Sequence, residues 1–184
     1  MSKSVLVVLA DGFEEIEAIT PIDVLRRAGL QVKTAGVGKR EIAGAHGIQV
    51  TADLVLEEYA DIPDALVLPG GMPGAENLKR SRALSSLLSK MKEKNNLVGA
   101  ICASPARVLA PGGFLDGKKA TCYPGFEKEF GPSVRFVEDR VVCDGRVVTS
   151  RGPGSALEFA LELVTQLVGA ETSRKLSETM IAKT

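Results

Sequence analysis

Cys102 lies where one expected element passes into another, in the segment VGAICASPARVLA (residues 98–110). An apolar run ends at this cysteine, small residues follow, and Pro105 suits a first helical turn because its missing N–H costs nothing there. The partial positive charge at a helix N-terminus favours a thiolate. The segment therefore predicts an elbow that presents a nucleophile, similar to the serine elbow of hydrolases but without its glycines. On position alone, a small buried hydrophobe is an equally good interpretation of Cys102.

A glycine turn, LPGGMPG, supplies a second group of candidates. Gly70 and Gly71 let the main chain come close to a ligand and turn an amide toward it. If this turn lies opposite the elbow, the N–H groups of Gly71 and Ala103 would form a two-donor oxyanion site beside Cys102. Taken alone, the motif is equally consistent with a plain turn.

Three glutamates open the helix that we expect over residues 14–28. Acidic side chains in a first turn commonly interact with the helix dipole in solvent, and this is the role expected for Glu14 and Glu15. The apolar neighbours of Glu17, beginning with Ile16, indicate that the helix becomes buried there. A carboxyl group in a dry cleft has a raised pKa, so Glu17 could stay protonated and donate to a thiolate.

The remaining metal-ligating and sulfur-containing residues predict no further site. His46, the one histidine, lies in the loop AGAHGIQV and is interpreted as a surface residue. No Cys/His cluster has metal-ligand spacing, and GKREIAG lacks the P-loop pattern, so we expect no metal and no cofactor. Cys122 and Cys143 lie in strand-like segments and are interpreted as packing residues. An odd number of cysteines without paired spacing favours free thiols in a reducing compartment.

The composition indicates a globular chain with no bias toward a polyanionic partner. The 184 residues suit one domain, 1–184, and 45% of them are hydrophobic. Lys+Arg and Asp+Glu both number 23, so nucleic acid is not an expected partner. The apolar run Val5–Ala10 is too short for a signal-peptide core or a membrane span. We therefore expect a cytoplasmic protein that does not associate with membranes.

Short β-branched runs alternate with amphipathic stretches in the order expected of an α/β sandwich with a mostly parallel sheet. Pro21 predicts a kink or a restart within the first helix, and Asp144-Gly145 predicts a hairpin. Strands are expected at residues 5–10, 30–37, 47–54, 64–69, 96–101 and 118–123 and within 134–150, and helices at 14–28, 82–94, 155–169 and 171–182. Ligands gather beyond the carboxyl ends of parallel strands, where ADGFEEIE, LPGGMPGAEN and AICASPA are expected to converge.

Five ordered stretches give the chain a specific resemblance over nearly its whole length: VLADGFEEIEA, PIDVLRRAG, VLPGGMPGAENL, AICASPARVLA and TSRGPGSALEFAL. The sequence resembles the DJ-1/PfpI (ThiJ/PfpI) superfamily, and within it the DJ-1-like branch. The resemblance implies a flavodoxin-like three-layer α/β/α sandwich and a homodimer. It also implies that Cys102 is the elbow cysteine, that Glu17 is its partner carboxylate, and that the amides of Gly71 and Ala103 face the sulfur.

The pocket implied by this resemblance includes Arg27 and Arg151, which fall on positions near the dimer interface. Two positions depart from the family pattern. The protease-like branch has histidine after the cysteine, so Ala103 argues against a Cys–His peptidase. The DJ-1-like branch has histidine before proline in the segment after the elbow helix, where this chain has Tyr123. Whether Tyr123 or His46 takes over from that imidazole is left open.

The resemblance implies two functions that share one site. The first is cysteine-dependent processing of α-oxoaldehydes such as methylglyoxal or glyoxal, as a glutathione-independent glyoxalase or protein deglycase protecting against carbonyl and oxidative stress. The second is a redox-sensing stress protein or chaperone whose cysteine is oxidised to sulfinate. The expected partners are therefore a small aldehyde or an oxidant and a second copy of the chain. An intracellular peptidase is the third and least favoured function.

Overall fold

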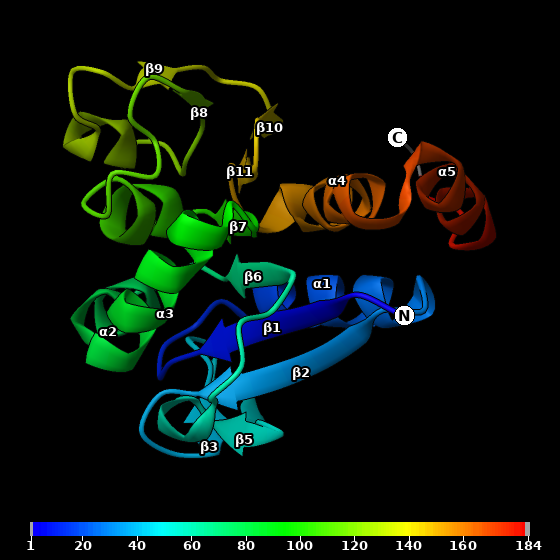
Figure 1. Ribbon diagram of the computed structural model, residues 1–184, viewed down its shortest axis with the longest axis horizontal. Coiled ribbons are helices and arrows are strands. Elements are labelled where there is room, and N and C mark those ends of the chain that lie inside the picture. Colours follow the sequence, from blue (N-terminus) through cyan, green and yellow to red (C-terminus); the bar gives the residue numbers. More distant parts are fainter. Residues whose placement is uncertain (1, 183–184) are drawn as a thin grey trace.

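The computed structural model describes residues 2–182 and contains a central seven-stranded sheet (Figure 1). The strand order is β10-β11-β7-β6-β1-β2-β5, and all neighbours are parallel except β10 and β11. The strands are β1 (Ser4–Leu9), β2 (Gln31–Gly36), β5 (Leu54–Val55), β6 (Ala65–Leu68), β7 (Leu97–Ile101), β10 (Val141–Asp144) and β11 (Val147–Ser150). The prediction of a mostly parallel sheet is confirmed.

Helices cover both faces of this sheet, so the fold is the expected three-layer sandwich. Helices α1 and α4 pack together on one face with α5 against α4, and α3 covers the other face (Figure 1). The helices are α1 (Glu15–Arg27), α2 (Gly74–Arg80), α3 (Arg82–Lys94), α4 (Ala156–Val168) and α5 (Ala170–Thr179), and shorter helical turns span Leu56–Glu58, Pro105–Leu109, Phe126–Glu129 and Pro153–Ser155. In the described residues, no helix is both long and apolar enough to cross a membrane.

The central strands read as continuous apolar runs because both of their faces are buried. In β1, Val5, Val7 and Leu9 pack on the side of α1 and α4, whereas Leu6 and Val8 pack on the side of α3. Successive side chains of a strand point to opposite faces, so one short segment contributes to both halves of the core.

Two predicted strands take a different place from the one expected. Residues 47–54 divide between β4 (Gln49–Thr51), which pairs with β3 (Glu41–Ala43) outside the main sheet, and β5 at the edge of the main sheet. The carboxylate of Asp53 accepts the N–H of Thr34 at 2.8 Å, in place of a backbone partner on a longer edge strand. Similarly, β8 (Lys119–Ala120) pairs with β9 (Arg135–Phe136) in a separate two-stranded sheet.

The first helix runs unbroken through Pro21, so the alternative of a restart at that residue is wrong. Proline removes one helical hydrogen bond. Pro21 is buried, and its neighbours Ile22 and Leu25 belong to the core between the sheet and α4. This packing compensates for the missing bond. The predicted hairpin at Asp144-Gly145 is confirmed, since it joins β10 to β11 with Gly145 at a φ of 63°.

Candidate active site

The elbow forms directly after β7, at the carboxyl edge of the sheet. Cys102 has a φ of 64°, a left-handed conformation that is rare for a residue with a side chain and is associated with functional strain. Its N–H donates to the carbonyl of Ser150 at 2.9 Å, and its carbonyl accepts from the N–H of Tyr123 at 2.9 Å. Pro105 then begins a tight helical turn, as expected. The thiol therefore projects from a backbone that is fixed on both sides.

Glu17 approaches this thiol from the first turn of α1. Its side chain is fully buried, and its Oε2 accepts the N–H of Gly70 at 2.9 Å. Its Oε1 has no hydrogen-bond partner among residues 2–182. A Cβ added to Gly70 would lie 2.5 Å from Cys102 Cβ and 2.7 Å from Glu17 Oε2, so only glycine fits between the two residues. The structure thus brings Glu17, Gly70 and Cys102 together.

Two backbone N–H groups face the sulfur in the way the sequence predicts. The amides of Gly71 and Ala103 both donate toward Cys102 Sγ and favour its ionised form. Gly71 has a φ of 88°, and a Cβ there would collide with the main chain of Phe13 and Glu14. The glycine turn therefore packs against the loop that precedes α1. This contact places two donors where negative charge on a sulfur or an adjacent oxygen would develop.

Burial dominates the electrostatics of the Cys102–Glu17 pair. It raises the pKa of Glu17 to about 7, against the lowering effect of the Gly70 N–H. Burial also raises the pKa of the Cys102 thiol, the charge of Glu17 raises it further, and the N–H groups of Gly71 and Ala103 oppose both effects. The charge of the helix terminus was expected to favour a thiolate, but burial of Cys102, which is 9% exposed beside a carboxyl group, outweighs it and the thiol pKa is raised. Two adjacent anions are unfavourable there, so ionisation of one group opposes ionisation of the other.

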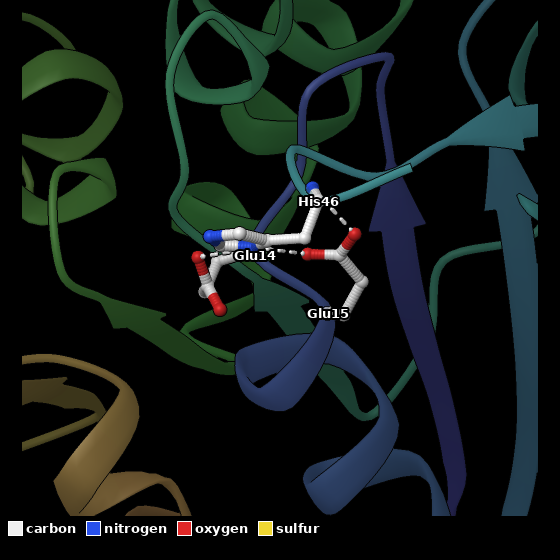
Figure 2. A group of neighbouring side chains, drawn as sticks. All are labelled: Glu14, Glu15 and His46. Carbon is white, nitrogen blue, oxygen red and sulfur yellow. Dashed lines mark hydrogen bonds and ion pairs between the residues drawn. The ribbon is translucent and has the colours of Figure 1, made fainter. Parts of the chain in front are cut away.

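His46 lies in the turn between β3 and β4, and it contacts Glu14 and Glu15 rather than Cys102 (Figure 2). Its side chain is 69% exposed, which agrees with the interpretation as a surface residue. Its Nδ1 lies 2.9 Å from Glu15 Oε2 and 3.6 Å from Glu14 Oε2. The sequence showed no such cluster, because Glu14 and Glu15 stand at the start of α1 and His46 in a turn about 30 residues later. Their ligand atoms lie within 4.8 Å of one another.

The expectation that Glu15 is a solvent-exposed partner of the helix dipole is wrong. Its side chain is 7% exposed because the turn that carries His46 covers it. Its Oε1 accepts the N–H of His46 at 2.7 Å and that of Ile48 at 3.4 Å. Burial opposes ionisation of Glu15, yet the hydrogen bonds from His46 and the main chain hold the pKa of its carboxyl below the usual value. Glu15 therefore fastens the β3–β4 turn to the start of α1.

The surroundings of Glu17 also differ from those predicted. Ile16 and Ile19 are 53% and 44% exposed, so these apolar side chains next to Glu17 in sequence do not mark a buried face of the helix. Glu17 is buried nevertheless, because it points to the opposite side of α1, toward the glycine turn. The prediction that Glu17 is buried is therefore confirmed, but the neighbouring isoleucines do not cause its burial.

The other predicted pocket residues separate into two groups. Tyr123 and Arg151 line one cavity, and the main chain of Tyr123 is hydrogen-bonded to that of Cys102. Arg27 lies at the far end of α1, ten residues or about 15 Å along the helix from Glu17, and pairs with Asp23 at 2.7 Å. Within one chain, the structure therefore does not bring Arg27 to the thiol.

Sequence reasoning missed Gly152, which separates Tyr123 from Glu17. A Cβ on this glycine would lie 3.1 Å from the Tyr123 ring and 4.0 Å from Glu17 Oε1. The signal available in the sequence was a Gly-Pro-Gly turn directly after the strand RVVTS, at the same sheet edge as the elbow. Without a side chain, Gly152 leaves the space between the aromatic ring and the free carboxyl oxygen open.

Comparison with known proteins agrees with this geometry. A family model described as the DJ-1/PfpI family matches residues 3–166. The chain is 41% identical over 184 residues to Protein DJ-1 homolog B of Arabidopsis thaliana, covering 99% of this chain but 42% of that protein, so it spans less than half of that relative's length. It is 37% identical to Glutathione-independent glyoxalase DJR-1.2 of Caenorhabditis elegans, covering 95% of this chain and 94% of that one. The crystal structure of Drosophila melanogaster DJ-1beta superposes with a TM-score of 0.95 at 38% identity over the full length of both chains.

Proposed function

Because the chain belongs to the DJ-1/PfpI family, we propose that it is a cofactor-independent enzyme that converts 2-oxoaldehydes such as methylglyoxal and glyoxal into 2-hydroxy acids. The observation that carries this proposal is the buried pair of Cys102 and Glu17 beneath the N–H groups of Gly71 and Ala103. One relative is named a glutathione-independent glyoxalase. The physiological role would be protection against carbonyl and oxidative stress, including removal of such aldehydes from protein adducts as a deglycase.

The first step is addition of the Cys102 sulfur to the aldehyde carbon. The sulfur forms the new C–S bond, the carbonyl oxygen becomes an oxyanion, and the N–H groups of Gly71 and Ala103 stabilise that charge. Glu17 gives its proton to this oxygen and becomes a carboxylate. The product is a hemithioacetal on Cys102.

Glu17 then acts as a base on the same intermediate. Its carboxylate removes the proton from the former aldehyde carbon, and the resulting enediol receives a proton at the neighbouring carbon from the same carboxyl group. This transfer converts the hemithioacetal into a thioester. Water hydrolyses the thioester, releases the 2-hydroxy acid and restores the thiol, so no external oxidant or reductant is needed.

Hydrogen bonds from the main chain stabilise the negative charge that the mechanism needs on the Cys102 sulfur. The sulfur receives two backbone N–H donors, whereas Glu17 receives one, from Gly70. Hydrogen bonds to an anion stabilise it. The resting thiol keeps its proton because burial raises its pKa. We propose that this proton passes from sulfur to the Glu17 carboxylate when the substrate binds, which produces the attacking thiolate without help from an imidazole.

Two measurements on the purified protein separate this function from the second candidate. The purified protein with methylglyoxal is expected to form lactate catalytically, with many turnovers per chain, measured by an enzymatic lactate assay. The second candidate is a redox-sensing stress protein or chaperone, favoured by the free Glu17 Oε1, which could donate a hydrogen bond to a sulfinate. Absence of lactate, together with addition of two oxygen atoms to Cys102 by mild peroxide in mass spectrometry, would favour that candidate over the enzyme.

A cysteine peptidase remains the least favoured function. Ala103 follows the cysteine, and the one histidine, His46, pairs with Glu15. A Cys–His mechanism requires an imidazole within hydrogen-bonding reach of the thiol. The structure instead places a carboxyl group beside Cys102.

We also propose that two copies of the chain associate through the exposed face at the start of α1. Ile16, Ile19 and Ile48 are 53%, 44% and 57% exposed, and the main chain of Ile48 contacts Glu15 beside Ile16. Exposed apolar clusters of this kind mark interaction surfaces. Light scattering is expected to give the mass of two chains, and Ile16→Glu to give one. A wild-type monomer, or an equal effect of Glu at the exposed Val168, would contradict this interface. We further propose a cytoplasmic location, since the three cysteines are free thiols, as is usual in a reducing compartment.

A further inference from the structure

A cavity of about 220 Å³ lies on the far side of Gly152 from Glu17, since Gly152 lines the cavity and a Cβ added to it would lie 4.0 Å from Glu17 Oε1. Tyr123 forms part of its wall and donates its backbone N–H to the carbonyl of Cys102. Gly152 forms another part of the wall. Because Gly152 has no side chain, nothing from this residue covers the buried Oε1 of Glu17, which has no hydrogen-bond partner among residues 2–182. Two residues of its wall, Tyr123 and Gly152, are thus the immediate neighbours of Cys102 and Glu17.

The cavity wall carries one uncompensated positive charge. Of its two arginines, Arg140 is neutralised by Glu158, with Nε 2.8 Å from the nearer carboxylate oxygen. Arg151 forms no ion pair with any carboxylate of residues 2–182. Its guanidinium lies over the ring of Phe136, 5.9 Å from the centroid, and its charge favours ionisation of the buried Cys122 thiol. A guanidinium without an ion-pair partner is a recognition group for carboxylate or phosphate.

The other side of the cavity is apolar. Tyr123, Pro124 and Pro153 contribute ring surfaces, and the Tyr123 ring is held edge-on against Phe126 with centroids 6.4 Å apart. Because Tyr123 is 45% exposed, its ring offers accessible surface to a ligand. Flat apolar walls with one convergent charge are typical of sites for small organic acids.

We propose that this cavity recognises a carboxylate borne by the substrate at the end remote from its aldehyde, with Arg151 binding the carboxylate and Tyr123 contacting the group between them. The inference rests on the proposed function and narrows its substrate class to anionic 2-oxoaldehydes that carry an aryl or similarly bulky group. Methylglyoxal has neither the charge nor the bulk, and it leaves both Arg151 and the apolar wall unused.

Alkylation of Cys102 tests this recognition without any turnover. The sulfur displaces bromide from 4-(bromomethyl)benzoate and from 4-(bromomethyl)benzamide, two reagents that differ in charge but have similar shape. The rate for each is followed by mass spectrometry of the Cys102 peptide, and the benzoate-to-benzamide ratio is compared between variants. Arg151→Gln is expected to lower this ratio by about tenfold, as for one partly screened ion pair.

Two further variants show whether charge recognition is the cause. Arg151→Lys retains the charge and is expected to keep most of the wild-type ratio. Arg82→Gln removes an exposed arginine from the start of α3 and is expected to leave the ratio unchanged. An unchanged ratio in Arg151→Gln would overturn the inference, as would equal slowing of both reagents, which would indicate a structural role for Arg151.

A turnover experiment then separates this inference from the proposed function. The Arg151→Gln variant is expected to raise KM for 4-carboxyphenylglyoxal by about tenfold while leaving KM for phenylglyoxal unchanged. If methylglyoxal yields no lactate, the proposed function fails, and the alkylation ratio still decides whether Arg151 recognises an anion. If methylglyoxal is converted but neither arylglyoxal is, the inferred substrate class fails and the proposed function stands. If both compounds turn over with the same KM in both proteins, the recognition fails and the proposed function stands.

Discussion

Replacement of Cys102 by serine is expected to reduce lactate formation from methylglyoxal by at least about 10³-fold, because loss of a covalent nucleophile removes the whole reaction path and not one stabilising contact. Serine is close to cysteine in size, and a hydroxyl with a much higher pKa does not supply an anion beside Glu17. The left-handed backbone at residue 102 already accommodates a side chain, so the fold should be retained. Initial rates of lactate formation at saturating methylglyoxal give the measurement.

Cys143→Ser is the matched control for this variant. Cys143 is an exposed thiol on β10, outside the elbow, and its removal is expected to leave the rate within about twofold of wild type. Circular dichroism and the midpoint of urea unfolding establish that both variants are folded. Lactate formation by Cys102→Ser at more than a tenth of the wild-type rate would exclude Cys102 as the nucleophile.

Glu17→Gln is expected to remove a pH dependence of stability that the buried carboxyl group imposes. In the folded protein the pKa of Glu17 is raised from 4.5 to about 7, so between these values the folded state holds a proton that the unfolded state has lost. The free energy of unfolding of the wild type therefore decreases as pH rises from 4.5 through 7. Relative to Glu17→Gln, which cannot ionise at this position, the free energy of unfolding of the wild type should fall by about 3 kcal/mol over this pH range.

Urea unfolding of both proteins at several pH values between 4.5 and 8 measures this difference. Subtraction of the two curves cancels the contribution of the other titrating groups. Glu93→Gln, at an exposed position on α3, provides the control. Its free energy of unfolding is expected to change with pH in the same way as that of the wild type. A constant difference between wild type and Glu17→Gln would mean that Glu17 ionises in the fold as it does in water.

The same variant tests the coupling between the two groups of the pair. If Glu17 and Cys102 share a proton, the pH dependence of the Cys102 alkylation rate must shift when the carboxyl group becomes an amide. An identical profile in both proteins would show that the pair does not form. Both the mechanism and the sulfinate alternative would then lack their proton donor.

Local patterns in the sequence were sufficient for the architecture and for the centre of the site. The apolar runs around β1, β6 and β7 predicted strands buried on both faces, and their pairing in one parallel sheet is confirmed. Pro105 and its small neighbours predicted the elbow, because proline suits a first helical turn and small side chains permit a tight bend whatever surrounds them. Five motifs at family spacing then identified the family, and the match over residues 3–166 confirms it.

Burial and charge partners required the tertiary structure. Nothing near Glu15 in sequence shows that the turn with His46 covers it, and nothing near Ile16 shows that its side of α1 faces outward. Similarly, the helix terminus seen in the sequence favours a thiolate, whereas burial and the neighbouring Glu17, which only the fold brings there, raise the pKa of Cys102.

What the sequence by itself determined is the succession of strands, helices and sharp turns, since these depend on side-chain periodicity and backbone freedom within a few residues. Only the tertiary structure decided which carboxyl groups are buried, that Arg151 has no ion-pair partner among the described residues, and that Gly152 leaves open the space beside Glu17. Desolvation and Coulomb interactions act through space, and the atoms that exclude water from a residue come mainly from distant parts of the chain.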